Sequence, residues 1–177
     1  MAGRIAVVDA ENRFVRWEDR RTVHVERLVH RSIHVLIFDA EGRLLLQRRH
    51  RDKQTYPRYW DLSCAGHVEE SDYPGGPDEA LDQVYREVAA REVEEELGVR
   101  PALEELGHFP PEPGVHYEQI RLFRGASDGP FVIQEEEVEE LRPVSSAELA
   151  ELERQGEPLT EALCWFVAWL RDRGLWA

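Results

Sequence analysis

Short apolar runs separated by polar turns fill the first third of the chain, and their spacing predicts β-strands. These runs are Ile5–Val8, Phe14–Trp17, His34–Phe38, Arg43–Arg48 and Trp60–Ala65. The runs at 34–38 and 43–48 flank the turn sequence Asp-Ala-Glu-Gly, which predicts a β-hairpin. Residues 19–32 are highly charged and show no assignable pattern, whereas residues 50–58 predict a polar loop.

A helical pattern follows the loop at residues 72–78, which holds two prolines and two glycines. Between Glu79 and Leu97, apolar residues recur at the spacing of an α-helix. This stripe consists of Leu81, Val84, Val88, Ala89 and Val93. Gly98 follows at the position where glycine commonly ends a helix, and Pro101 comes shortly after it.

The last third of the chain alternates between strand and helix patterns without a strict βα repeat. Strands are expected at 102–109, 117–124, 131–133 and 138–144. Ser145 and Glu148 have the spacing of a capping box, which predicts a helix through Arg154. A final amphipathic helix is expected at Leu159–Leu170, with its aromatic residues in the core.

The composition narrows the class of protein. The chain has 177 residues, of which 42% are hydrophobic, and we expect one domain over 1–177, with an N-terminal strand extension (1–28) and a C-terminal helix (156–177). The apolar stretch 162–170 is too short to cross a bilayer, and the N-terminus lacks a signal-peptide pattern. We therefore expect a cytoplasmic protein that does not bind membranes. Two cysteines, Cys64 and Cys164, predict buried thiols rather than a disulfide framework.

The formal net charge of −14 argues against nucleic-acid binding, because phosphate backbones require a basic surface. The same charge is unfavourable for a protein that handles phosphates, unless divalent cations lie between its carboxylates and the substrate. No P-loop or dinucleotide-binding glycine motif is present in the sequence.

Three glutamates near the end of the expected helix carry the candidate chemistry. Glu92, Glu95 and Glu96 are spaced i, i+3 and i+4, so their side chains share one side of the helix, whereas Glu94 points elsewhere. Their mutual repulsion and the helix dipole both disfavour this arrangement, and a bound cation would offset both effects. Mg²⁺ suits such a site because it takes carboxylate, water and phosphate oxygens. Taken alone, the run is more often a solvated acidic face.

The neighbouring residues resemble the Nudix signature: Gly, five residues, Glu, seven residues, then Arg-Glu-aliphatic-any-Glu-Glu-any-Gly-aliphatic. The second half is matched by Arg91, Glu92, Val93, Glu95, Glu96, Gly98 and Val99. In the first half Gly66 fits, and Asp72 stands where the family has Glu. Eighteen residues, rather than seven, then precede Arg91, so eleven are extra (the inserted segment, residues 73–83). Gln83 occupies the nominal spacing before Arg91.

The resemblance implies an α/β fold, a Nudix-like α/β/α sandwich with a mixed β-sheet, and hydrolysis of a diphosphate in a small-molecule substrate such as a nucleoside diphosphate linked to another group. Glu92, Glu95 and Glu96 would bind Mg²⁺ or Mn²⁺, together with the carbonyl of Ala65, and Arg91 would orient a glutamate. Glu118 would supply a base or an extra ligand, with Glu135, Glu136 and Glu137 as alternatives. Arg48, Arg49 and His67 are candidate substrate contacts.

Two alternatives remain open. The order of motifs over residues 30–150 resembles the Nudix branch that lies close to type I isopentenyl-diphosphate isomerase. That enzyme uses a cysteine at the position of Ala65, and Cys64 is one residue early, which places it on the other face of a strand. His30 and His67 match two of its metal ligands, whereas His116 replaces a glutamate. The other alternative is a Nudix-fold binding module without catalysis. The apolar C-terminal helix allows either core packing or a homodimer interface.

Overall fold

The computed structural model describes residues 3–176 and contains strands and helices in mixed order. The elements are β1 (Arg4–Val8), β2 (Phe14–Asp19), α1 (Arg20–Val25), β3 (His30–Phe38), β4 (Leu44–Arg49), β5 (Trp60–Asp61), β6 (Cys64–His67), η1 (Glu70–Asp72, a 3-10 turn), α2 (Leu81–Leu97), β7 (Glu104–Phe109), β8 (Glu118–Ala126), β9 (Val138–Val144), α3 (Ser146–Arg154) and α4 (Glu161–Asp172).

Within residues 3–176, one mixed sheet of nine strands organises the fold. β3 lies at its centre and is buried along its length up to Ile37. It pairs in parallel with β8, from His30 opposite Glu118 onwards, and antiparallel with β6. β1 pairs with β3, and β2 pairs with β1. β4, which also pairs with β3, pairs in turn with β5 and β9. The expected mixed sheet is confirmed.

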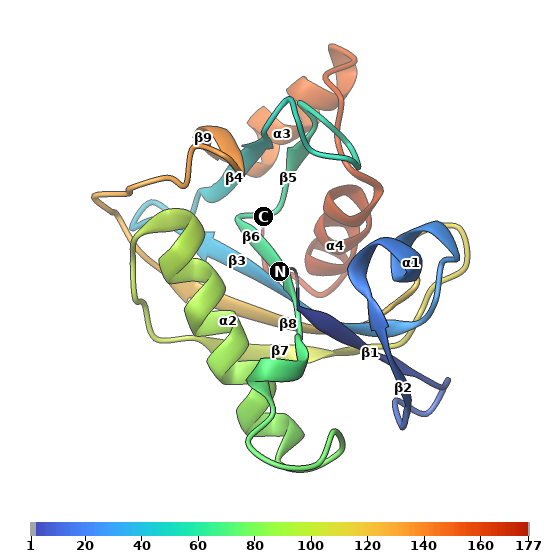
Figure 1. Cartoon of the computed structure of the whole chain (residues 1–177). Helices are drawn as coiled ribbons and strands as arrows, with labels where there is room; N and C mark the ends of the chain where they lie inside the picture. Colours follow the sequence, from blue (N-terminus) through green and yellow to red (C-terminus); the bar gives the residue numbers. More distant parts are fainter. Residues whose placement is uncertain (1–2, 177) are drawn as a thin grey trace.

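Helices cover both faces of this sheet (Figure 1), which confirms the expected sandwich. On one face, α2 packs through Val84, Val88 and Val93 against residues of β3 and β6. On the other face, α3 and α4 pack with their apolar residues against β4 and β8. Leu163 and Phe166 of α4 are fully buried, so the aromatic residues of this helix contribute to the core as expected.

Several local predictions were wrong. The expected strand Trp60–Ala65 is interrupted at Leu62-Ser63, which separates β5 from β6. At this break the Ser63 hydroxyl accepts a hydrogen bond from Ile37 N and donates one to the carbonyl of Leu45. Residues 131–133 form no strand, because Val132 N donates to the carbonyl of Leu97 instead of to a sheet partner. The unassigned charged stretch forms the end of β2, α1 and the start of β3. Its helix begins after Asp19, whose carboxylate accepts from Thr22 N.

α2 begins at Leu81 and α4 at Glu161, each two residues later than the sequence pattern indicated. The inserted segment is therefore a loop as far as Ala80, and its last three residues form the start of α2. Among residues 3–176, no helix is both long and apolar enough to cross a membrane.

Candidate functional site

The acidic side of α2 faces β6. Glu96 is 7% exposed, and Glu92 is also mostly buried, whereas about half of the Glu95 side chain is exposed. Arg91 Nη1 lies 2.9 Å from Glu92 Oε1 and 3.0 Å from Glu95 Oε2, so one guanidinium holds two carboxylates in place. Glu94 pairs with Arg100 instead, as expected for a residue that points away from the other three.

Gly66 of β6 allows Glu92 to approach the strand. A Cβ added at Gly66 would lie 2.5 Å from Glu92 Cγ and 2.7 Å from its Oε1, closer than any ordinary contact. The glycine of the motif is therefore required by packing and not by a special backbone angle. This close approach brings the Glu92 carboxylate beside the backbone of Ala65-Gly66, where a carbonyl ligand was predicted.

Burial disfavours the charged forms of Glu92 and Glu96. Burial raises the pKa of Glu92 to about 7, and the neighbouring charges of Glu96 and Glu95 act in the same direction against the opposing effect of Arg91. Burial also raises the pKa of Glu96, although Gln47 Nε2 donates to its Oε2 at 3.0 Å. Carboxylate oxygens gathered in this way fit a hard divalent cation, which would stabilise their charged forms.

Asp72 takes part in this arrangement despite the inserted segment. Its Oδ2 lies 3.3 Å from Arg91 Nη2 and accepts from Glu69 N at 2.8 Å. Asp72 therefore contacts the motif arginine, although eighteen residues separate the two in sequence. The sequence could not establish this contact, because it does not specify the path of the inserted segment.

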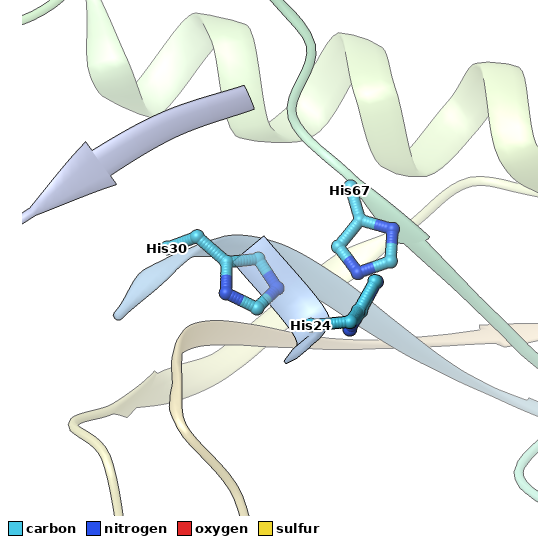
Figure 2. Close-up of side chains that lie close together, drawn as sticks. All are labelled: His24, His30 and His67. Carbon is cyan, nitrogen blue, oxygen red and sulfur yellow. The ribbon is translucent and has the colours of Figure 1, made fainter. Parts of the chain in front are cut away.

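Histidines form a second group beside the glutamates. His24 of α1, His30 of β3 and His67 of β6 each offer a ring nitrogen, and these atoms lie within 4.8 Å of one another. Figure 2 shows the three rings gathered at one place, although they come from three separate elements. His30 and His67 were expected together from the isomerase resemblance, which did not point to His24.

Glu118 belongs to this histidine group rather than to the glutamates of α2. Its carboxylate lies 3.3 Å from His30 Nε2, 3.4 Å from His34 Nε2 and 3.6 Å from His67 Nε2. Burial raises the pKa of Glu118, but the three imidazoles outweigh this effect and hold it well below its usual value. Burial lowers the pKa of His67 to about 3, so its ring is neutral and has a lone pair available for a metal.

β6 separates the two groups by the alternation of its side chains. Cys64 and Gly66 face α2, where they adjoin Glu96 and Glu92, whereas His67 faces Glu118. Cys64 is fully buried, and burial raises the pKa of its thiol well above the usual value. Its thiol thus lies on the α2 side of the strand, as the one-residue offset predicted.

Basic residues of β4 and the following loop adjoin the glutamates. Arg49 Nη1 lies 3.2 Å from Asp61 Oδ2, and Arg48 stacks on Trp60 and pairs with Glu140. Lys53, the only lysine in the sequence, was not predicted as a site residue. Burial and the charge of Arg49 lower the pKa of Lys53, and the charges of Glu96 and Glu92 raise it.

The acidic run before β9 has other partners. Glu137 contacts Lys53, and Glu139 lies 3.5 Å from Arg51. Glu135 and Glu136 are exposed. These contacts hold the loop 50–58 against β9. Among the proposed alternatives to Glu118, Glu137 contacts Lys53, whose charge lowers the pKa of Glu96.

Comparisons with known proteins agree with the motif. The model of the NUDIX domain family matches residues 28–166. An uncharacterized Nudix hydrolase of Pseudomonas aeruginosa is 39% identical over 140 residues, which cover 78% of this chain and 76% of the relative. An isopentenyl-diphosphate Delta-isomerase of Streptomyces avermitilis is 39% identical over 130 residues, 70% of this chain and 60% of the isomerase. A crystal structure from Deinococcus radiodurans shares the fold with a TM-score of 0.74 at 20% identity and covers 93% of this chain and 97% of that one.

Proposed function

This chain belongs to the Nudix hydrolase family, and we propose that it cleaves a phosphoanhydride bond with Mg²⁺ or Mn²⁺ held by Glu92, Glu95 and Glu96. The observation that carries the proposal is the set of three carboxylates on one side of α2, bridged by Arg91 and pressed against Gly66. The bound cation would neutralise phosphate oxygens and lower the pKa of a water molecule that attacks phosphorus.

In this proposal, other residues orient the three glutamates and complete the metal site. Arg91 fixes the orientation of Glu92 and Glu95, and Gln47 fixes that of Glu96. The carbonyl of Ala65 is a further oxygen ligand in this proposal, because Glu92 lies against the same stretch of β6. The burial of Glu92 and Glu96 excludes much of the surrounding water, which strengthens their attraction for a cation.

Lys53 and Arg49 are proposed to bind the substrate phosphates. The charges of both groups act on the pKa of Glu96, and each would exchange its present acidic partner, Asp61 or Glu137, for a phosphate. Arg49 can bind phosphate oxygens with two parallel hydrogen bonds, whereas Lys53 supplies a single charge. Arg48 stacks on Trp60 and pairs with Glu140, and it stays a candidate contact beside these two. A nucleoside diphosphate linked to another group is the proposed substrate class.

The histidine group is a second candidate metal site. Imidazole nitrogens and one carboxylate suit Mn²⁺, Fe²⁺ or Zn²⁺ better than Mg²⁺. Glu118 would then act as a ligand outside the motif helix, and His67 as a metal ligand rather than a substrate contact. This site follows the isomerase resemblance, but the position of the thiol does not favour isomerisation, because Cys64 faces Glu96 on the other side of β6. Mass spectrometry of the products from isopentenyl diphosphate separates hydrolysis from isomerisation.

A phosphate-release screen over nucleotide sugars, dinucleotides, nucleoside triphosphates and prenyl diphosphates, with Mg²⁺ and with Mn²⁺, tests the activity. Glu96→Gln should stay folded and lose more than about 100-fold in turnover, since it removes a direct ligand and not an outer contact. Glu94→Gln is the matched control, because Glu94 lies on the same helix but pairs with Arg100. Equal losses in both variants, or no turnover of any substrate by the wild type, would contradict the proposal.

A further inference from the structure

Arg31 is a completely buried arginine that the proposed reaction does not use. Its Nε donates to Asn12 Oδ1 at 2.8 Å, and its Nη2 donates to the Asn12 carbonyl at 2.6 Å and to Asp78 Oδ1 at 2.6 Å. Its Nη1 donates to the Tyr73 hydroxyl at 3.1 Å and to the carbonyl of Pro77. A buried guanidinium with five such bonds permits one arrangement of its partners, because every lost bond leaves a buried polar group unpaired.

These partners come from two segments that are far apart in sequence. Asn12 belongs to the turn between β1 and β2, whereas Tyr73, Pro77 and Asp78 belong to the inserted segment. Asp78 also links the two segments directly, because its Oδ1 accepts a hydrogen bond from the backbone N of Phe14 in β2 at 3.0 Å.

Further contacts outside the arginine hold the same two segments together. The rings of Trp17 and Tyr73 meet edge-on with centroids 5.4 Å apart. Ile5 forms an isolated bridge with Glu69, just before η1. The β1–β2 hairpin and residues 69–78 therefore pack as one body around Arg31.

One residue of this body contacts the motif arginine, Arg91. Asp72 lies within it and contacts Arg91, whose guanidinium contacts Glu92 and Glu95. A free loop of this length would leave the position of Asp72 relative to α2 undefined, because ordering each of its residues costs backbone entropy. The contacts of Arg31 remove that freedom, since they fix the inserted segment between Asp72 and α2.

We propose that the β1–β2 hairpin and the inserted segment, joined through Arg31 and Asp78, form a positioning unit that sets the metal-binding glutamates through Asp72 and Arg91. The inference rests on the proposed metal site at Glu92, Glu95 and Glu96. It explains how this chain can carry eleven extra residues inside the motif and keep Asp72 in contact with Arg91. Arg31, Asp78 and Asp72 are positioning residues, since they act on the carboxylates through other side chains.

Binding of Mn²⁺, followed by its electron paramagnetic resonance signal without substrate, tests this unit. All variants carry His67→Ala as well, which removes one nitrogen of the histidine group and so limits Mn²⁺ binding at that second candidate site. Asp78→Asn and Asp72→Asn should each weaken the binding by about tenfold, at the lower end of the effect of outer contacts on metal affinity. The double variant should be no weaker than either single one, because both changes interrupt the same path. Asp82→Asn is the matched control: Asp82 also lies in the inserted segment and pairs with an arginine, Arg121, outside this path.

The outcomes separate this inference from the proposed function. Losses of affinity that multiply in the double variant, or a loss in Asp82→Asn equal to that in Asp78→Asn, would overturn the positioning unit. If Asp78→Asn does not fold, Tyr73→Phe removes one bond to Arg31, and unchanged Mn²⁺ affinity in that variant would overturn it as well. Unchanged Mn²⁺ binding in Glu96→Gln, by contrast, would contradict the proposed metal site itself.

Discussion

Substitution of Gly66 by alanine tests how strictly β6 positions Glu92. The new Cβ would lie 2.5 Å from Glu92 Cγ, whereas ordinary contacts begin near 3.4 Å, so the side chain must retreat by about 0.9 Å. A displacement of about 1 Å at a reacting group can cost about 100-fold in rate. That loss corresponds to about 2.7 kcal/mol of transition-state stabilisation. We expect Gly66→Ala to lower kcat/KM with Mg²⁺ by this factor.

The fold should tolerate this substitution. The backbone at Gly66 is not left-handed, and alanine in a strand gains about 0.5–1 kcal/mol over glycine in conformational entropy, which offsets part of the repulsion. Gly107→Ala in β7 is the control, since its Cβ would meet Phe109 at an ordinary 3.4 Å. Unfolding temperature, Mn²⁺ affinity and kcat/KM are measured for both variants. Wild-type Mn²⁺ affinity and turnover in Gly66→Ala would refute the argument that Glu92 must lie against β6.

Three further predictions follow from the same structure. Lys53→Ala should raise the KM for a diphosphate substrate by about tenfold, which corresponds to roughly 1.4 kcal/mol of binding free energy. Lys53→Arg keeps the positive charge and should restore part of the lost affinity. Removal of divalent cations with a chelator should abolish turnover and lower the unfolding temperature, because buried Glu92 and Glu96 then lose their compensating charge; an unchanged transition would contradict the metal site. Leu170→Ala in α4 should cost about 2–5 kcal/mol in urea unfolding while Mn²⁺ affinity is retained, since Leu170 is 1% exposed in the core on the face opposite α2.

The glutamates of α2 could be found from sequence because their spacing fixes their common side on any helix. The same reasoning separated Glu94 from the others, and its pairing with Arg100 agrees with this. Gly66 was found as a position in a motif, but its reason, the approach of Glu92, required the packing of α2 on β6. The predicted role of each residue in catalysis stays a prediction.

The histidine group could be predicted only in part. His30 and His67 were matched to metal ligands through the isomerase resemblance, whereas His24 lies in a six-residue helix whose charged sequence has no apolar stripe. Its side chain reaches the other two because α1 follows β2 directly and returns the chain to β3. A short helix of this kind depends on tertiary contacts, because helices below about 12 residues are marginal in isolation.

By itself the sequence determined the periodic elements, the motif helix and the family, because apolar periodicity and fixed spacings are local properties of the chain. Only the tertiary structure decided which distant groups meet. It placed Glu118 among the histidines and Lys53 against Glu137, and it brought Asp72 to Arg91 across the inserted segment. Such contacts depend on strand pairing and on buried hydrogen bonds between remote segments, which no local pattern specifies.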